Sequence, residues 1–525
     1  MTGRTGGKSG MPFDVIVAGA GLGGLGCAAR LAGQGRRVLV LEKNNHIGGT
    51  SYIFHRKGYT FPMGPLSFSF PELVLNFLRA AGVEAEITFR RNHFQLLSPR
   101  LDIVYSVPLE SLLRELERLF PEEKVGLQAV FRELVGIIEQ TKNIHSWHPD
   151  YLPKADGRAP EYGPPELRSV LARVRELSLT PSRRLLDRHL VERALKNFLG
   201  SQGTSEPEMS LQTLAFMWNA MTEVGIWSPS CGVHGLSDLL ADSVRRRGGE
   251  IRLDTGVRNI RVEKGRVTGV VTESGESLDA PWVVSNVDPK KTFLELCSDS
   301  DLPPEFRAKV AGTPYTDSEL CVYLGVDPAG IDWRRMRASH LFFRQKEEPP
   351  EGGPEDLEDF EAREIEICRW SDNSPDHVPP GKSSLVLRVS FPYDHFAGYR
   401  AGEKKRRPEY QARKSALTRR LIGAAEKALP GLGPAIEVVE SATPLTYADW
   451  GRRYRGSIAG WTWSADYGQA FGSKLLTETP VENLLLTGIY AAAELFLGGV
   501  PTALHTADLA ARIILGEPLQ PRPGF

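Results

Sequence analysis

The chain has little of what would mark a secreted, metal-binding or membrane-spanning protein. Its 525 residues include only five cysteines, which form no C-x-x-C pair and no Cys/His cluster: Cys27, Cys231, Cys297, Cys321 and Cys368. Scattered cysteines of this kind favour reduced, buried thiols over disulfides or a zinc site. No apolar run of about 18 residues is free of charges, so the sequence predicts no transmembrane helix.

The chain also carries almost equal numbers of positive and negative charges. Lysine and arginine together number 64 against 65 aspartate and glutamate residues, and the formal net charge is -1. A chain this balanced gives no general reason to expect nucleic-acid binding. No Ser/His/Asp triad, metal-ligand box or P-loop is apparent. The polar, glycine-rich residues 1–12 are expected to be disordered, and the remainder to form a large globular protein of the cytoplasm.

The most informative feature is a glycine-rich turn between two predicted strands. Apolar residues 15–18 and 38–41 each predict a buried strand, with a helix between them. The turn before that helix has the spacing G-x-G-x-x-G, formed by Gly19, Gly21 and Gly24. Such glycines allow a tight turn, bring backbone close to a pyrophosphate and let helix and strand pack closely. Glu42 follows the second strand, where a carboxylate accepts hydrogen bonds from ribose and disfavours NADP.

A second pair of glycines points to FAD rather than NAD. Gly48 and Gly49, followed by Thr50, bring the backbone towards the pyrophosphate again. The alternative, a glycine-rich turn in an ordinary α/β domain, leaves these glycines and Glu42 unexplained. The residues predicted to bind the cofactor here are Gly19, Ala20, Gly21, Leu22, Gly23, Gly24, Glu42, Lys43, Gly48, Gly49 and Thr50.

The rest of the sequence predicts a fold assembled from separate segments. Short strands between residues 249 and 286, and a strand and helix between Leu484 and Leu515, return the chain to the nucleotide-binding part. Helices are expected over 166–223, where residues such as Met217 line either the core or a substrate tunnel. We predict an α/β fold with a Rossmann-like FAD-binding domain of the glutathione-reductase type and an inserted α+β substrate domain. The FAD-binding domain comprises 13–70, 225–300 and 445–525, and the insert comprises 71–224 and 301–444.

Two charged segments lie in the second part of the insert. Residues 346–366 are acidic and rich in proline and glycine, and we expect an exposed excursion there. Residues 400–420 carry many lysines and arginines and predict a helix. A solvated helix face is the usual explanation, and contact with an anionic membrane surface is the alternative.

Several stretches of the chain resemble the FAD-dependent family of phytoene desaturases, carotenoid isomerases and retinol saturases, from Asp14 to Leu515. Besides the N-terminal glycines, the similar stretches are Gly58–Pro65, Gly225–Gly235, Trp370–Lys382 and Asn483–Pro501. Pro62 stands where the family usually has an aspartate, and Ile489 where it usually has an acid or amide. The resemblance implies that Val257, on the middle strand of a second nucleotide-domain segment, holds the adenine side through its backbone. It implies further cofactor contacts from Ser285, Asn286, Gly488, Gly499, Val500 and Pro501.

By this resemblance the chain is an FAD-dependent oxidoreductase that acts on a long apolar polyene or isoprenoid. It would desaturate, saturate or isomerise carbon–carbon double bonds by hydride exchange with flavin N5. We expect a dry apolar tunnel with few acid–base residues. Glu494 and His505 are the candidate catalytic groups, and the simpler alternatives are a surface carboxylate and a helix-face histidine. Peripheral contact with a membrane is compatible with an apolar substrate.

Two other functions stay open at this point. One is a flavin amine oxidase or a porphyrinogen-oxidase-like enzyme, because these share the N-terminal block. The other is a non-catalytic FAD-containing protein that binds lipid. The sequence leaves open which polyene is used, the direction of the reaction, the electron acceptor and the oligomeric state.

Overall fold

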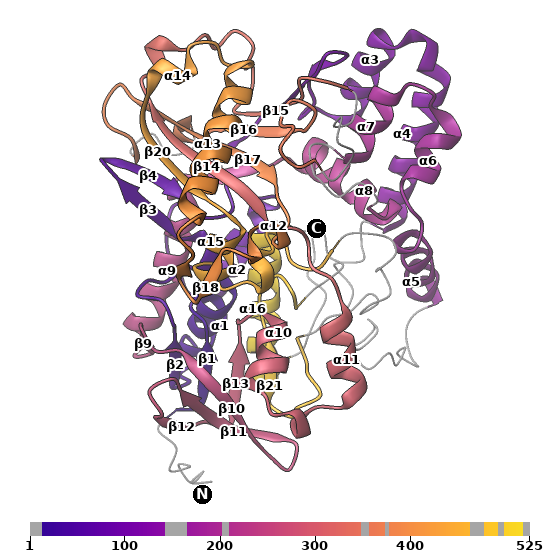
Figure 1. Ribbon diagram of the computed structural model, residues 1–525. Coiled ribbons are helices and arrows are strands. Elements are labelled where there is room, and N and C mark those ends of the chain that lie inside the picture. Colours follow the sequence, from indigo (N-terminus) through magenta and orange to yellow (C-terminus); the bar gives the residue numbers. More distant parts are fainter. Residues whose placement is uncertain are drawn as a thin grey trace, which may run out of the picture.

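A five-stranded parallel sheet carries the glycine-rich turn (Figure 1). The computed structural model describes residues 13–141, 165–201, 209–347, 356–372, 377–462, 477–491 and 498–517. Along the sheet the strands are β21 (Leu484–Leu486), β13 (Trp282–Ser285), β1 (Val15–Ala18), β2 (Val38–Leu41) and β9 (Glu250–Arg252). All four pairings are parallel, so the carboxyl ends of the strands meet at one edge. The glycine turn lies at that edge, where open α/β sheets bind their ligands.

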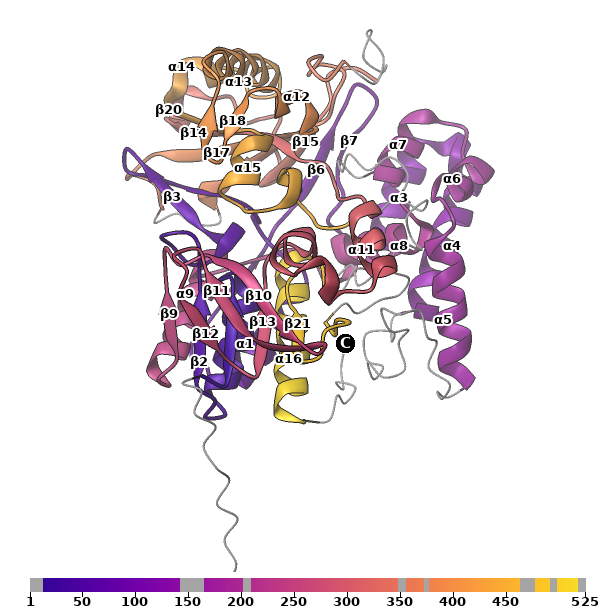
Figure 2. The same ribbon diagram turned by 60° about the horizontal axis from the view of Figure 1, so that its bottom comes forward.

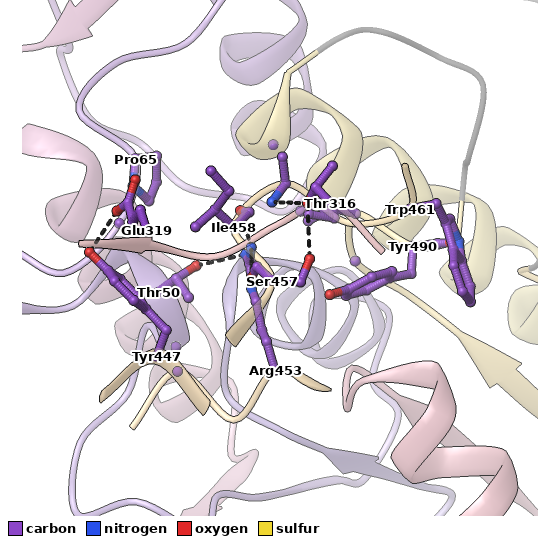
Figure 3. Close-up of a pocket in the computed structure, with 18 of the residues that line it drawn as sticks. Thr50, Pro65, Thr316, Glu319, Tyr447, Arg453, Ser457, Ile458, Trp461 and Tyr490 are labelled. Atoms are coloured by element: carbon purple, nitrogen blue, oxygen red, sulfur yellow. Dashed lines mark hydrogen bonds between the residues drawn. The ribbon is translucent and has the colours of Figure 1, made fainter. Parts of the chain in front are cut away.

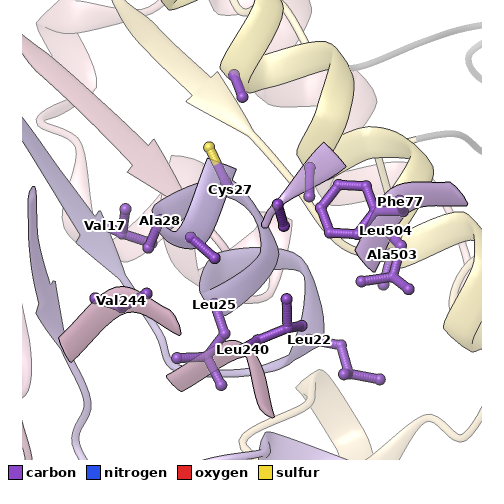
Figure 4. Close-up of a cluster of buried hydrophobic side chains, with 14 of the residues drawn as sticks. Val17, Leu22, Leu25, Cys27, Ala28, Phe77, Leu240, Val244, Ala503 and Leu504 are labelled. Atoms are coloured by element: carbon purple, nitrogen blue, oxygen red, sulfur yellow. The ribbon is translucent and has the colours of Figure 1, made fainter. Parts of the chain in front are cut away.

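Four helices pack together beside this sheet (Figure 4). They are α1 (Leu22–Ala32), α2 (Pro71–Ala80), α9 (Gly232–Arg246) and α16 (Gly499–Leu515). Every residue of α1 is buried, which explains its small side chains: a Cβ on Gly26 would lie 3.0 Å from the Phe77 ring. Helix α2 belongs to this core, although the predicted boundary at residue 70 assigns it to the insert.

A small antiparallel sheet accounts for the other predicted strands of this part. It consists of β10 (Val257–Glu263), β11 (Arg266–Thr272) and β12 (Ser277–Asp279), in that order. Val257 therefore begins an edge strand, and the expectation that it lies on a middle strand is wrong. The alternating pattern predicts the strands but does not say which sheet each one joins, because that depends on partners far away in the chain.

A seven-stranded mixed sheet forms the second layer (Figures 1 and 2). Its strands, in order, are β20 (Ile436–Ala442), β14 (Glu319–Val326), β17 (Ser383–Ser390), β16 (Ile365–Arg369), β15 (His340–Phe343), β6 (Phe94–Leu97) and β7 (Asp102–Val104). One face is apolar and packs in a core with α13 (Tyr410–Glu426). The opposite face carries Glu366 and Arg388, which lie directly opposite each other on neighbouring strands.

Two expectations for this layer are wrong. The predicted helix over 400–420 begins only at Tyr410, because β18 (Arg400–Gly402) and β19 (Lys405–Arg406) form a hairpin before it. Lys404 has a positive φ of 56°, a conformation that a helix does not tolerate. The predicted exposed excursion is also not exposed throughout: its described end contains buried Phe360 and continues into strand β16.

A cluster of helices forms the third part, beside the seven-stranded sheet (Figures 1 and 2). These helices are α3 (Leu109–Leu119), α4 (Lys124–Thr141), α5 (Pro165–Ser178), α6 (Arg183–His189), α7 (Arg193–Ser201) and α8 (Leu211–Asn219). Trp218 lies in their core, edge-on to Phe198 and Tyr105. Within the described ranges, every helix is too short or too polar to serve as a membrane span.

The remaining strands and α-helices are short connections. They are β3 (Ile53–Arg56), β4 (Tyr59–Pro62), β5 (Phe89–Arg91), β8 (Trp227–Pro229), α10 (Pro289–Lys291), α11 (Pro304–Gly312), α12 (Asp394–Ala397), α14 (Leu432–Ala435) and α15 (Pro444–Asp449). Among them, the hairpin of β3 and β4 packs on the seven-stranded sheet, with Phe54 edge-on to Tyr323. The hairpin thereby belongs to a core on the face of the seven-stranded sheet that carries Tyr323.

Candidate functional site

One continuous cavity of about 1460 Å³ joins the three parts of the molecule. Its walls come from the glycine turn, the polar face of the seven-stranded sheet and helix α8. Figure 3 shows the central part, where Thr50, Pro65, Glu319 and Tyr447 come from four separate segments. A cavity of this size is large enough for a dinucleotide cofactor and a substrate together.

The glycine turn is tight enough to exclude side chains. A Cβ on Gly24 would lie 2.0 Å from the carbonyl oxygen of Gly19, and one on Gly21 would lie 2.6 Å from Nδ2 of Asn286. Gly19 itself has a φ of 98°, which favours glycine. Bare backbone therefore faces the cavity at the start of α1, as a phosphate cradle requires.

Glu42 lies at the end of β2 and is held by two backbone groups. The N–H of Ala20 donates to Oε2 and the N–H of Asn44 donates to Oε1, both at 2.8 Å. The side chain is buried and lines the cavity. A carboxylate accepts several hydrogen bonds, so the fixed Glu42 can still receive hydroxyl groups of a ribose.

The second glycine pair packs against the first turn. The N–H of Gly48 donates to the carbonyl oxygen of Ala20 at 2.8 Å, and Gly48 and Gly49 both have positive φ, 98° and 57°. The next residue, Thr50, accepts a hydrogen bond from Arg453 at 3.1 Å (Figure 3). The two loops thus form one wall of the cavity.

The amino-terminal ends of two helices face this cavity. Residues at the starts of α1 and α16 line it, and among the described residues no side chain caps either end. Uncapped N–H groups and the helix dipole make both ends suitable for negative charge. The middle of α16 is tied to the segment after β21 through Thr506, whose hydroxyl accepts from the N–H of Gly488 at 3.0 Å.

Most residues predicted to bind the cofactor line this cavity. They are Gly19, Gly21, Leu22, Gly23, Glu42, Lys43, Gly48, Gly49, Thr50, Val257, Asn286, Gly488, Gly499 and Val500. Ala20, Gly24, Ser285 and Pro501 are not part of its lining. They support it from behind: Ser285, for example, is fully buried and its hydroxyl lies 2.8 Å from that of Thr292.

The structure describes only one of the two candidate catalytic residues. His505 lies on α16, half-buried, and the cavity lining does not include it. Glu494 lies outside the described residues. The cavity instead contains titratable groups that the sequence analysis did not select.

These groups form a charged wall on the seven-stranded sheet. Arg388 donates from Nε to Oε2 of Glu366 at 2.9 Å, and Nδ1 of His340 lies 2.9 Å from Oε1 of the same carboxylate. Beside them, the Tyr447 hydroxyl donates to Oε1 of Glu319 at 2.6 Å (Figure 3). All five residues line the cavity, so the expectation of few acid–base residues is wrong at this end. The signal was present: single charges interrupt apolar strand patterns at Glu366 and Arg388.

Burial and ion pairing shift the pKa values of these carboxyl groups in opposite directions. Burial tends to raise the pKa of Glu366, but Arg388 and His340 outweigh it and lower that pKa to about 2. Glu364 is buried nearby, and the loss of solvation raises its pKa although Arg344 lies 3.3 Å away. Burial also raises the pKa of Tyr447, so its hydroxyl stays protonated and acts as a donor to Glu319.

Apolar side chains form another stretch of the cavity wall. Met217 and Met221 come from the helical part, Ile226 from the segment before β8, and Phe94 and Phe342 from the seven-stranded sheet. These side chains can hold a hydrocarbon chain away from water. The cavity therefore offers a phosphate-compatible end, an apolar stretch and a charged wall.

The chain is similar to known flavoproteins over nearly its whole length. The sequence profile of flavin-containing amine oxidoreductases matches residues 22–515. The zeta-carotene-forming phytoene desaturase of Myxococcus xanthus is 27% identical over 534 residues, covering 97% of this chain and 96% of that enzyme. The chloroplastic prolycopene isomerase of Arabidopsis thaliana is also 27% identical, covering 87% of this chain and 75% of that one.

A solved structure shares the mixed α/β fold of flavin oxidoreductases. It is that of an oxidoreductase from Methanosarcina mazei, with a TM-score of 0.61 and 16% identity, covering 94% of this chain and 99% of that one. At this identity the likeness concerns the fold alone.

Proposed function

The chain belongs to the family of flavin-containing amine oxidoreductases and is an FAD-dependent enzyme, and from this premise we propose that it changes carbon–carbon double bonds in a long apolar polyene or isoprenoid. The change is a desaturation, a saturation or an isomerisation. The observation that carries the proposal is the single cavity that connects the glycine cradle with the apolar stretch around Met217 and Phe342.

The cofactor fits the cradle because the backbone of Gly19, Gly21 and Gly23 lines the cavity at the start of α1. In this proposal the turn around Gly21 and the loop at Gly48 and Gly49 hold the pyrophosphate, and Glu42 holds the adenosine ribose. The start of α16 faces the flavin end. We also propose that residues 13–70, 225–300 and 445–525 form a Rossmann-like FAD-binding domain, into which 71–224 and 301–444 are inserted.

When bound, FAD supplies hydride exchange with a carbon atom of the substrate. The chain's own part is to place the substrate and exclude water. Met217, Met221 and Phe342 supply apolar contact along the carbon chain, and a fixed pose brings reacting atoms together without further loss of entropy. A cytoplasmic location with peripheral membrane contact remains a prediction that accords with an apolar substrate.

An anaerobic titration tests the proposal. Purified, FAD-loaded protein, with the flavin oxidised in one series and reduced by dithionite in another, is mixed with carotenoids and retinoids in detergent, and the flavin absorbance and the products are followed. We expect at least one polyene to bleach the oxidised flavin, to re-oxidise the reduced flavin or to emerge with altered double bonds. If every polyene is inert while an amine or a porphyrinogen is turned over, the proposal is wrong.

A further inference from the structure

We propose that the substrate carries a hydroxyl group at one end, and that Glu319 and Arg388 hold this hydroxyl at the charged wall of the cavity. The inference rests on the proposed function and narrows its substrate class to polyene or isoprenoid alcohols. A pure hydrocarbon has no donor or acceptor and cannot form a hydrogen bond with this wall.

The site is a gap between one acceptor and one donor. Oε1 of Glu319 is engaged by Tyr447, while Oε2 lies 3.9 Å from Nη1 of Arg388, too far for a direct hydrogen bond. One oxygen atom between them can lie about 2.8 Å from each. A hydroxyl both donates and accepts, so it can bind the carboxylate and the guanidinium at once.

Both partners are held in place before a ligand arrives. Glu319 is only 5% exposed and is oriented by Tyr447. The Nε and Nη2 atoms of Arg388 bind Glu366, which His340 contacts in turn. Only Nη1 of the guanidinium thus points towards the gap. A prearranged donor and acceptor of this kind bind a matching group at little further cost in side-chain entropy.

A hydrocarbon in the same position would be unfavourable. It would displace water from a carboxylate and a guanidinium and give no hydrogen bond in return. The apolar stretch formed by Met217, Met221 and Phe342 belongs to the same cavity and suits the rest of the chain. A polyene alcohol matches both kinds of wall.

The charge balance disfavours an ionised end group. Carboxylates outnumber guanidinium groups in the charged wall itself: Glu319 and Glu366 against Arg388. A carboxylate or diphosphate on the substrate would be repelled by this excess. An ammonium group would have to lie beside the half-buried Arg388, with which it would compete for the carboxylates.

Matched pairs of ligands test the inference on the intact holoenzyme. Retinol is compared with deoxyretinol, and the hydroxylated carotenoid rhodopin with lycopene, each titrated anaerobically in micelles while the flavin spectrum is followed. Because a hydrogen bond to a charged group is strong, we expect the alcohol of at least one pair to bind roughly tenfold more tightly or better. Equal binding within both pairs overturns the inference and leaves the proposed function standing.

The other outcomes are equally decisive. If none of the four polyenes perturbs the flavin, the proposed function fails, and the inference fails with it. If retinoic acid or retinylamine binds more tightly than retinol, the end group is charged and the hydroxyl assignment is wrong.

Two variants locate the site. Glu319→Gln keeps the size of the side chain but turns an amide towards Arg388, and we expect the preference for the alcohol over the hydrocarbon to fall about tenfold. Glu364→Gln makes the same change on the same wall outside the gap, and should keep the preference. Melting temperature and flavin content check that both variants fold. An unchanged preference in folded Glu319→Gln contradicts the assignment, and the wild-type pairs decide the question if that variant does not fold.

Discussion

At the scale of single residues, the glycine turn depends on the space left by the Cβ atom that glycine lacks. The nearest neighbour of a Cβ on Gly24 is a backbone oxygen, which cannot rotate away as a side chain can. At Gly21 the nearest neighbour is the end of the Asn286 side chain, which has more freedom to move. Gly24 is therefore the more stringent of the two positions, although it does not line the cavity.

The substitution Gly24→Ala should abolish retention of FAD. The added methyl would lie 2.0 Å from the Gly19 carbonyl and force α1 away from the turn. Gly136→Ala on α4 is the matched control, since among the described residues no heavy atom comes within 4 Å of the place its methyl group would take. Flavin absorbance per protein measures the effect, and circular dichroism checks the fold. A Gly24→Ala protein with full flavin content would refute the role of the turn.

Only those residues of the site that belong to one local sequence motif could be predicted from the sequence. The glycines and Glu42 stand out because their spacing is tied to one local unit of strand, turn and helix. Glu319, Tyr447 and Arg388 come from β14, α15 and β17, and only the folded sheet brings them together. His505 is a candidate because it lies near a recognisable block, and nearness in sequence does not place a side chain in a cavity.

At the scale of elements, strands with buried charges explain the polar wall. In β16 and β17, residues on one face belong to the core with α13, while Glu366 and Arg388 alternate with them and meet across the two strands. A pattern of period two predicts such strands well. It does not reveal that the second face borders a cavity. The hairpin before α13 was missed because its lysines and arginines also suit a helix.

The ion pair between Glu366 and Arg388 predicts that the free energy of unfolding depends on pH. Its pKa falls from 4.5 to about 2, so its contribution is fully present above pH 4.5 and is lost as pH falls towards 2. The size of this contribution is about 3 kcal/mol. Glu366→Gln removes it, and we expect the difference in free energy of unfolding from wild type to shrink as pH falls from about 7 to about 3.

Urea denaturation at several pH values measures that difference. Glu364→Gln is the control with the opposite sign, because burial raises the pKa of Glu364 and its ionised form costs stability as pH rises. A Glu366→Gln difference that stays constant with pH would mean that the ion pair with Arg388 does not stabilise the fold.

At the scale of the whole molecule, the proposed FAD site is assembled from distant segments. The flavoprotein family, the enzyme class and FAD were predicted from the sequence and are confirmed. The domain boundaries stay a prediction, and α2 shows why they are difficult: its apolar face is evident, but the helix it packs against is known only from the fold.

Because one ligand in the proposed site would contact all these segments, FAD should stabilise the entire chain. Protein stripped of flavin should melt at a lower temperature than the holoenzyme, and adding FAD at about 100 times its Kd should restore about 2.7 kcal/mol. Scanning calorimetry with increasing FAD measures the shift. A melting temperature that is independent of FAD would show that the cofactor does not bridge the segments.

The order of strands in the parallel sheet also matters during synthesis. β13 ends at Ser285, but its neighbour β21 begins only at Leu484. While the ribosome makes the residues between them, the nascent chain has β13 as an open edge, and exposed edges of this kind pair with other strands. Ribosomes that stall in this interval should therefore leave chains that aggregate or occupy chaperones, and we expect the enzyme to take up its flavin only after α16, which follows the last strand, has been made.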